Sequence, residues 1–423
     1  MKLKLKSFGN IHTILGILLA MLLVQTVSAE TGFDNEVWIS TSTNTADLGT
    51  LDNPYDGSTQ ANFDYRMNLL PTNTTIHLLA GTYQTLGNSS GGYSLKSGQK
   101  VLGSGIDNTV VKLVANAQGN GSYVYVMASV GDCSNNVVSD LTLDCNFNFQ
   151  TIAHDGLILY GNHHAARSVK VVNSGGTTTS GSFGIVINAG SNQSEGNVVE
   201  NCEIGPVLAS DGFGIFFDGG ANNWASGIIR DNHIFFAPTP SGHQSTAIVG
   251  LMRNTLIEGN YINGAVAGVF GNGSTGGSTN ITVAHNVFEN VGVPVFFNAV
   301  SVWNLTVCYN TISSTTSNGI AWAFRFDSTG SYTNIAIVGN TVTFNGNQPA
   351  QDGRQFLWVN NITGLIVANN MVEPGLGNSL SSCANVSIYN NYDLSGNFLT
   401  NLNQVASPNG ITRKTVTYSG TRI

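Results

Sequence analysis

The sequence is poor in charge. Only 9% of its 423 residues are Asp, Glu, Lys or Arg, and the formal net charge is −8. Because no basic stripe exists, the sequence predicts no nucleic-acid partner, and an acidic glycan would need local cations. The five cysteines match no zinc-binding spacing, and their odd number leaves at least one thiol unpaired in an oxidising compartment. Calcium is the one metal considered, and no dedicated calcium motif is present.

Long hydrophobic runs are also missing. Lys2, Lys4 and Lys6 precede an apolar run from Ile14 to Val24, and Val27-Ser-Ala29 offers small residues for cleavage. The run is short for a membrane span and no later segment qualifies, so residues 1–29 are predicted to be a secretory signal peptide. The protein is therefore expected to be secreted, whether extracellular, periplasmic or at the cell surface.

What the sequence does have is a repeat: apolar, any, apolar, two residues, Asn, any, apolar. It reads Leu305-Thr-Val307-Cys-Tyr-Asn310-Thr-Ile312 in its clearest copy. Repeats of 20–50 residues built of short strands indicate a stack of coils, in which the Asn side chains would form a ladder at ~4.8 Å spacing. The predicted ladder residues are Asn146, Asn232, Asn260, Asn286, Asn310, Asn340, Asn370 and Asn391.

A second apolar run alternates with the first and opens with a small residue. Examples are Gly156-Leu-Ile-Leu159, Gly184-Ile-Val-Ile187 and Gly214-Ile-Phe-Phe217. Short β-branched runs punctuated by Gly and Asn are strand signals. Since the spacing leaves no room for helical crossovers, successive coils are expected to pair strand on strand in parallel.

This alternation resembles the pectin-lyase-like superfamily. The resemblance implies an all-β fold, a single-stranded right-handed parallel β-helix (a solenoid) with an N-terminal capping segment. It implies strands named PB1, PB2 and PB3 in each coil, with the Gly-led run as PB1, the Val-x-Val run as PB2 and the Asn bend before PB3. The expected boundaries are a cap region at 30–74 with a helix near Thr59–Leu70, the β-helix at 75–395, and a C-terminal cap or tail at 396–423. In that superfamily the groove along PB1 is the usual polysaccharide site.

Ionisable residues are concentrated in the middle coils. Residues 140–258 hold 19 Asp, Glu, Lys, Arg or His, whereas residues 259–351 hold four. Acid–base chemistry needs such groups, so the middle coils are the predicted location of an active site. The candidate catalytic residues before PB1 are His154, Asp155, Asp211 and His243, and those at or after its end are His163, His164, Arg167, Asp218 and Arg253.

Three functions follow from these residues. A lyase needs a base and a cation that neutralises a uronate carboxylate, and His163, His164, Arg167 and Arg253 are of those types. This favours cleavage of an acidic extracellular glycan by β-elimination. The alternative is a non-catalytic surface or carbohydrate-binding protein. The third is a glycoside hydrolase, because His154-Asp155-Gly156 resembles a polygalacturonase strand. The other motifs of that family are missing, and Asp155 and Asp218 should lie roughly 19 Å apart, too far for paired catalytic carboxylates.

One further column predicts sugar contacts. Strand alternation should turn the second residue after each PB1 glycine away from the interior. These residues include Phe216, Phe270 and Phe296, and Tyr160 lies on the same strand as another member, Ile158. Exposed aromatic rows can stack on sugar rings. The alternatives are that a loop or tail covers the row, or that the register is shifted by one residue and these side chains belong to the core.

Overall fold

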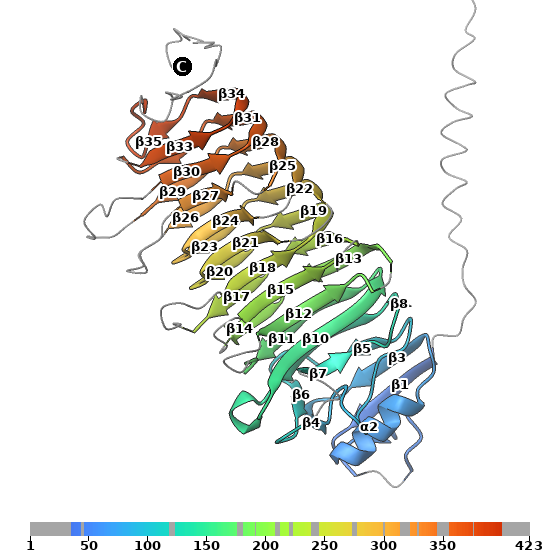
Figure 1. Ribbon diagram of the computed structural model, residues 1–423. Coiled ribbons are helices and arrows are strands. Elements are labelled where there is room, and N and C mark those ends of the chain that lie inside the picture. Colours follow the sequence, from blue (N-terminus) through green and yellow to red (C-terminus); the bar gives the residue numbers. More distant parts are fainter. Residues whose placement is uncertain are drawn as a thin grey trace, which may run out of the picture. The chain divides into compact units, whose positions relative to one another are not determined.

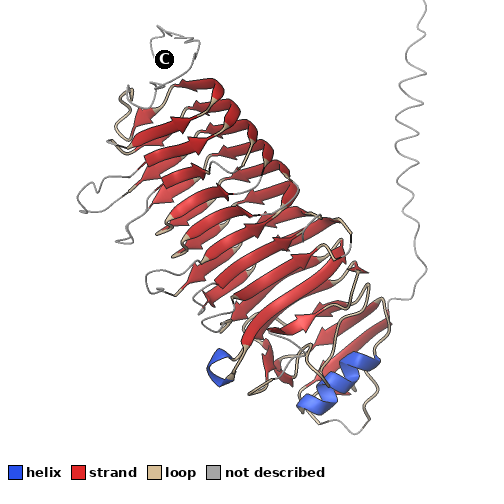
Figure 2. Cartoon of the chain, in the orientation of Figure 1, coloured by secondary structure: helices blue, strands red, loops and turns tan. Residues whose placement is uncertain are grey.

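The computed structural model shows a right-handed parallel β-helix, as the sequence predicted (Figures 1 and 2). The structure describes residues 35–43, 46–117, 123–175, 181–190, 192–207, 212–219, 223–237, 245–272, 277–298, 301–313, 322–327, 330–344, 355–374 and 376–399. Residues 36–423 form one compact unit. The predicted signal peptide lies outside the described residues. Within the described part of the chain, no helix is long and apolar enough to cross a membrane.

PB1 is an eleven-stranded sheet in which neighbouring strands come from successive coils. Its strands are β7 (Tyr123–Ala128), β8 (Cys133–Ser134), β10 (Ala153–Asn162), β12 (Ser182–Asn188), β15 (Gly212–Asp218), β18 (Thr246–Gly250), β21 (Ala267–Asn272), β24 (Val293–Asn298), β27 (Trp322–Phe326), β30 (Gln355–Asn360) and β33 (Gly377–Ser381).

PB2, PB3 and the N-terminal strands β1 to β6 belong to one 24-stranded sheet, because some strands run through the bend between PB2 and PB3. β9 (Val137–Asp144) and β11 (Ala165–Val172) run through that bend. The other PB2 strands are β13 (Ser194–Glu200), β16 (Ala225–Arg230), β19 (Met252–Glu258), β22 (Ser278–Ala284), β25 (Val302–Cys308), β28 (Tyr332–Val338), β31 (Ile362–Ala368) and β34 (Ala384–Tyr389). The PB3 strands are β14 (Glu203–Val207), β17 (His233–Phe236), β20 (Tyr261–Asn263), β23 (Val287–Glu289), β26 (Thr311–Ser313), β29 (Thr341–Thr343), β32 (Met371–Val372) and β35 (Tyr392–Asp393).

The N-terminal coils carry the predicted capping helix. It is α2 (Gln60–Leu69), and the Thr59 side chain caps it by accepting a hydrogen bond from the Asn62 amide. Its buried Phe63 packs against Tyr83, with ring centroids 5.1 Å apart. The strands around it are β1 (Asn35–Ser40), β2 (Tyr55–Asp56), β3 (Thr74–Leu78), β4 (Gly81–Thr85), β5 (Lys100–Leu102) and β6 (Thr109–Leu113), and the short helix η1 (Phe147–Phe149) follows β9. α2 therefore covers apolar side chains of the first coils.

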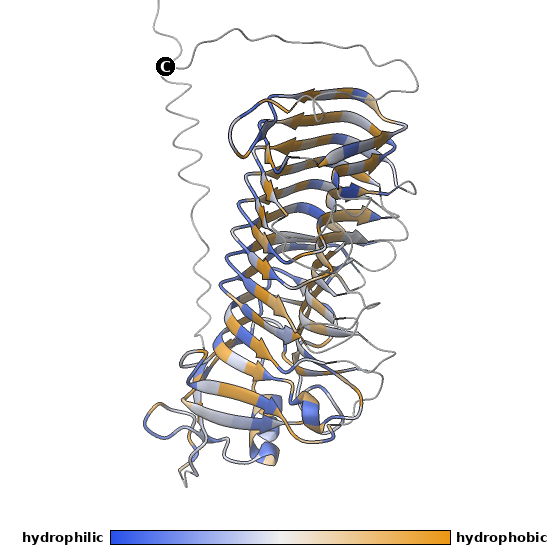
Figure 3. Cartoon of the chain, turned by 90° about the vertical axis from the view of Figure 1, so that its left-hand side faces the viewer, coloured by the Kyte–Doolittle hydropathy of each residue, from blue (hydrophilic) through white to orange (hydrophobic). Residues whose placement is uncertain are grey.

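Small residues open PB1 because PB3 needs the space. A Cβ added at Gly184 would stand 2.5 Å from Cγ2 of Ile204, a PB3 residue, and 2.6 Å from the Gly214 carbonyl oxygen. The next residue, Ile185, points into the core and is fully buried. Hydrophobic and hydrophilic residues alternate along the strands in Figure 3, as expected for sheets with one face on the core.

The predicted asparagine ladder is present from Asn232 onward. Each Asn donates from Nδ2 to Oδ1 of the next, over 2.8–3.0 Å at all six steps from Asn232 to Asn391. The ladder residues are buried. Asn146 is a correction, because its Nδ2 donates to the Leu113 carbonyl and its amide donates to Asp144 Oδ1. Leu141 and Val169 occupy the ladder position in those earlier coils, and Cys202 does so directly before Asn232.

All five cysteines carry free thiols. Cys202 shows why a thiol suits the ladder column: its amide donates to Asn232 Oδ1 at 2.9 Å, and its thiol lies 3.3 Å from the Glu200 carbonyl oxygen. Burial raises the pKa of the Cys202 thiol to about 12. This cysteine therefore acts as a small, neutral donor within the stack.

Candidate functional site

The outer face of PB1 carries a continuous column of apolar and aromatic side chains. Pairing places one residue of each strand in register, and several of the residues form a hydrophobic cluster separate from the core. Phe216, Phe270 and Phe296 are partly exposed members, so the alternation predicted from the sequence is confirmed. The column consists of Ala128, Ile158, Val186, Phe216, Val249, Phe270, Phe296, Arg325 and Trp358.

Further aromatic rings join this column from the start of the PB1 strands. Phe183 stacks on Phe213 with centroids 5.2 Å apart and on Phe216 at 5.5 Å. Tyr123 reaches Phe183 from an earlier coil at 5.9 Å. Phe270 and Phe296 stack at 4.9 Å further along. The face therefore presents ring surfaces at several successive coils.

A polar column borders the aromatic one at the other end of the PB1 strands. Tyr160, Asn188 and Asp218 pair in register, and Asn188 donates from Nδ2 to Asp218 Oδ2 at 2.8 Å. Asn298 and Asp327 follow two residues after the aromatic column in later strands. Burial, with the nearby Asp218 carboxylate, raises the pKa of Tyr160. Hydroxyl, amide and carboxylate groups thus run beside the rings.

Asp155 is a buried carboxyl group on this sheet. Its Oδ1 accepts a hydrogen bond of 2.6 Å from the Phe183 amide, and its Oδ2 has no hydrogen-bond partner. Loss of solvent raises the pKa of Asp155 well above the usual range. Tyr125 pairs with Asp155 in the neighbouring strand, and burial and the Asp155 charge raise the pKa of its phenol.

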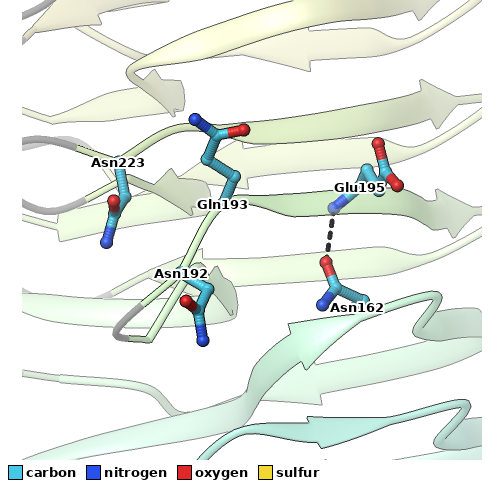
Figure 4. Close-up of a pocket in the computed structure, with 5 residues that line it drawn as sticks. All are labelled: Asn162, Asn192, Gln193, Glu195 and Asn223. Atoms are coloured by element: carbon cyan, nitrogen blue, oxygen red, sulfur yellow. Dashed lines mark hydrogen bonds between the residues drawn. The ribbon is translucent and has the colours of Figure 1, made fainter.

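A polar pocket lies beside the end of PB1, with a volume of about 450 Å³. It is lined by Asn162, Asn192, Gln193, Glu195 and Asn223 (Figure 4). The Glu195 amide donates to Asn162 Oδ1 at 2.9 Å, which leaves the Glu195 carboxylate directed away from that bond. Such a lining of amides and one carboxylate suits a ligand rich in hydroxyl groups.

Two of the predicted residues lie near this pocket, although its lining does not include them. His163 is exposed, and its Cδ2 would lie 2.5 Å from a Cβ added at Gly196, the residue after Glu195. The guanidinium of Arg253 lies over the ring of Trp224, the residue after Asn223, at 5.5 Å, and its Nε donates to the Gly277 carbonyl. The strand register separates His163 and Arg253 by three coils, or about 14 Å along the stack.

His164 lies in the interior, which corrects its placement on the groove edge. Its Nδ1 accepts a hydrogen bond from the Asn136 amide and its Nε2 donates to the Tyr160 carbonyl at 3.1 Å. The His164 amide in turn donates to Asn197 Oδ1. Burial lowers the pKa of His164 to about 4, so the ring is neutral at physiological pH. It serves as one step of a short polar ladder at the start of PB2.

Arg167 lies on the large sheet and not beside PB1, which is a second correction. Its Nε lies 2.5 Å from the Glu200 carboxylate, and Arg230 pairs with the same carboxylate at 2.5 Å. The three residues share one register row of PB2. The sequence prediction counted Arg167 as part of the segment after PB1, but the turn is so short that residue 167 already belongs to the next strand.

The remaining candidates separate into buried and undescribed residues. His154 is fully buried, with Nδ1 2.5 Å from the Ile152 carbonyl and Nε2 3.3 Å from the Ala117 carbonyl, and burial lowers its pKa. Asp211 and His243 lie outside the described residues. Among the residues that are described, no three His, Cys, Asp or Glu side chains come together as a metal site.

The sequence prediction missed the residues that line the polar pocket and part of the aromatic face. Asn162, Asn192 and Asn223 are asparagines, which are abundant in this chain, so no local signal marks them. Phe183 could have been found, because it lies directly before Gly184, the small residue that marks PB1 in its coil, and Tyr125 occupies the equivalent position before Val126. Arg325 falls in the same column as Phe296, a relation visible once the coils are aligned.

Comparisons with known proteins support the fold. No family model matches the chain, and no curated protein does. Among solved structures, the chain is similar to a mutant tailspike protein of E. coli bacteriophage HK620 in complex with a pentasaccharide. The two sequences are 11% identical, the match covers 83% of this chain and 66% of the tailspike chain, and the TM-score is 0.57.

Two further solved structures are similar. The Streptococcus pneumoniae surface protein and adhesin PfbA has 13% identity, 77% and 90% coverage of the two chains, and a TM-score of 0.56. The selenomethionine derivative of the GH136 lacto-N-biosidase from Eubacterium ramulus has 10% identity, 90% and 70% coverage, and a TM-score of 0.52. At these identities the likeness concerns architecture alone. The chain is a right-handed parallel β-helix protein.

Proposed function

We propose that this protein is secreted and binds a linear polysaccharide along the outer face of PB1. The observation that carries the proposal is the pair of parallel columns on that face. One column presents partly exposed side chains at Phe216, Phe270, Phe296, Arg325 and Trp358, whereas Ile158, Val186 and Val249 of the same column are buried. The other column presents a polar side chain two residues later, at Asp218, Asn298 and Asp327. A sugar ring has apolar C–H faces and polar hydroxyl edges, so a glycan lying along these coils meets both kinds of group.

The low charge of the chain agrees with such a ligand. Amides and carboxylates recognise hydroxyl groups by directed hydrogen bonds, and aromatic rings supply flat apolar surface for the C–H faces of sugars. The similar tailspike structure contains a pentasaccharide, and the similar GH136 protein is a lacto-N-biosidase. These neighbours support a carbohydrate ligand for a chain of this fold.

A binding assay tests the proposal. The purified protein is applied to immobilised neutral and acidic polysaccharides, and Phe270→Ala is compared with the parent protein. We expect retention on at least one polysaccharide, with clearly weaker retention of the variant. The matched control is Trp303→Ala, which removes a ring that is 41% exposed on the large sheet. Equal loss in both variants, or no retention by the parent protein, would refute the proposal.

A second function is supported by the position of His163. This accessible imidazole lies near the polar pocket. A base that removes the proton beside a uronate carboxylate, with a cation that stabilises the resulting charge, gives β-elimination. The product carries an unsaturated end that absorbs ultraviolet light. We propose His163 as the base of such a lyase acting on an acidic glycan, with Arg253, three coils further on, binding the carboxylate of another sugar residue of the same glycan.

Histidine replacement distinguishes this reaction from binding alone. His163→Ala should abolish the ultraviolet signal while leaving polysaccharide retention intact. The control is His233→Ala, because His233 is exposed and contacts Tyr261 edge-on on the large sheet. If no acidic polysaccharide yields an unsaturated product with the parent protein, the lyase function is wrong and binding stands on its own assay.

A further inference from the structure

A cation–aromatic cluster lies on the outer face of PB1 in its later coils. The Arg325 guanidinium on β27 is 4.4 Å from the Trp322 ring centroid, 4.7 Å from that of Phe296 on β24 and 4.9 Å from that of Trp358 on β30. The two tryptophan rings lie 5.9 Å apart at 33°. Three strands thus hold one guanidinium among rings that are each only partly buried. We call these four residues and Asp327 the Arg325 cluster.

The cluster is electrically neutral. Asp327 binds the guanidinium in a bidentate manner, accepting from Nε at 3.0 Å and from Nη2 at 3.1 Å. The side chains remain 24% and 14% exposed, so the outer edges of both groups reach solvent. Arg325 is the one lysine or arginine in the PB1 strands that the structure describes. A polyanion laid along this face would meet no uncompensated cation here.

A neutral Arg–Asp pair has the donors and acceptors that two adjacent hydroxyl groups need. The guanidinium keeps N–H groups beyond those used by Asp327, and each carboxylate oxygen keeps acceptor capacity. The tryptophan rings beside the pair supply apolar surface for the C–H face of a sugar. A carboxylate or sulfate on the ligand would compete with Asp327 for the guanidinium, and the negative charge of Asp327 would repel it. The chemistry therefore favours an uncharged ring with vicinal hydroxyls.

We propose that the Arg325 cluster is a second glycan subsite, one that takes an uncharged pyranose residue through a pair of adjacent hydroxyl groups. This inference rests on the proposed polysaccharide binding and adds a charge preference and a second position. β27 is four strand spacings from β15, where the polar column includes Asp218. That separation is about 19 Å, so a glycan reaching both needs roughly four or more residues.

The charge preference is tested by exchanging Asp327 for its neutral isostere. The parent protein and Asp327→Asn are applied to immobilised galactan, mannan, xylan and β-glucan as neutral probes, and to polygalacturonate, alginate and hyaluronan as acidic ones. We expect the parent protein to bind one or more neutral probes with little dependence on salt. Asp327→Asn leaves Arg325 unpaired and should shift retention toward the acidic probes, with retention that falls as salt is added.

The length of the oligosaccharide tests the distance between the two subsites. For the neutral polysaccharide that binds, oligosaccharides too short to reach from Asp218 to the Arg325 cluster should bind the parent protein and Trp358→Ala with equal affinity. Longer ones should bind the parent protein roughly tenfold or more tightly than the variant, as expected for loss of one well-placed contact. Arg325→Met serves as the second variant, and thermal unfolding identifies any variant that fails to fold. Arg230→Met is the matched control, because its ion pair lies on the large sheet.

The outcomes separate the two proposals. Retention on no probe refutes polysaccharide binding itself. Retention only on acidic probes, or equal binding by folded Arg325→Met and Trp358→Ala at every length, refutes the Arg325 subsite and leaves polysaccharide binding in place.

Discussion

Removal of a single rung should show how much the asparagine ladder contributes to stability. The buried Asn310 takes part in four side-chain hydrogen bonds. Its Nδ2 donates to the Val283 carbonyl and to Asn340 Oδ1, both at 2.9 Å. Its Oδ1 accepts from the Asn286 amide at 2.9 Å and from Asn286 Nδ2 at 3.0 Å. Asn310→Ala removes all four and leaves buried partners without them.

The magnitude follows from the count. A hydrogen bond contributes about 0.5–1.5 kcal/mol net, and an orphaned buried group costs about 1–3 kcal/mol, so we expect Asn310→Ala to lower the free energy of unfolding by about 4 kcal/mol. Because a solenoid can open coil by coil, urea unfolding is combined with a local measurement. Amide exchange at Asn286 should accelerate, since its N–H loses its acceptor.

The control lies in the same coil and belongs to a second, exposed row of asparagines. Asn304 donates to Asn280 Oδ1 at 3.0 Å and accepts from Asn334 Nδ2 at 3.1 Å, but all three are exposed. Its φ of +57° suits glycine. Asn304→Gly should cost no more than about 0.5 kcal/mol, because water replaces both bonds. Equal costs for the two variants would contradict the claim that burial gives the ladder its strength.

Three other changes have predictable effects. Gly184→Ala should lower the free energy of unfolding in urea by about 1–3 kcal/mol, because the added Cβ would clash with Ile204. An unchanged urea midpoint would show that the coil can shift to accommodate the methyl group. His164 has a pKa of about 4 in the folded protein, against an ordinary value of 6.5. Its contribution to the free energy of unfolding is therefore complete above pH 6.5 and declines as the pH falls toward 4. His164→Asn should make this decline smaller when the free energy of unfolding is measured across this pH range. Asp155 has the opposite pH dependence, because its pKa is raised in the folded protein. The unfolded chain releases this proton more readily, so the free energy of unfolding falls as the pH rises above the ordinary carboxyl pKa. Asp155→Asn keeps an acceptor for the Phe183 amide and should raise the melting temperature at neutral pH, and this gain should disappear in acid.

The repeat made the fold predictable from sequence. Each Asn marks one bend and each small residue marks the start of one PB1 strand, and these two signals fix register along most of the chain. That register was enough to predict that Phe216, Phe270 and Phe296 face away from the core. Asn146 fits the same pattern and was placed in the ladder wrongly, since the bend in that coil comes earlier, at Asp140, which has a φ of +57°.

The site was less predictable because it depends on turn lengths that differ between coils. A tight turn places His164 inside and Arg167 on the next strand, although both follow PB1 closely in sequence. His163, directly before them, has a φ of +56° and stays at the surface. Three neighbouring residues thus reach three environments, and residue type alone does not separate them.

The bend between PB2 and PB3 is built in two ways, and the choice explains where polar residues are buried. The residue before the ladder position is left-handed in both halves, as at Ser168 (φ +49°) and His285 (φ +55°). With Val169 at the ladder position, backbone pairing continues and β11 runs through the bend. With Asn286 there, the strand breaks, and side-chain amides take over the backbone groups that pairing has released.

The coils with apolar ladder positions bury their polar groups at the opposite end of PB2. Asn136, His164 and Asn197 form a hydrogen-bonded row there, whereas later coils have Ile281 and Leu305 in register with it. Each coil thus stacks buried polar side chains at one end of PB2 and apolar ones at the other. The change occurs around Cys202 and Asn232, close to the coils whose PB1 edge forms the polar pocket. The buried row of Asn136, His164 and Asn197 holds the short turn that carries His163. The stability of the coils and the position of His163, the proposed base, therefore depend on the same hydrogen bonds.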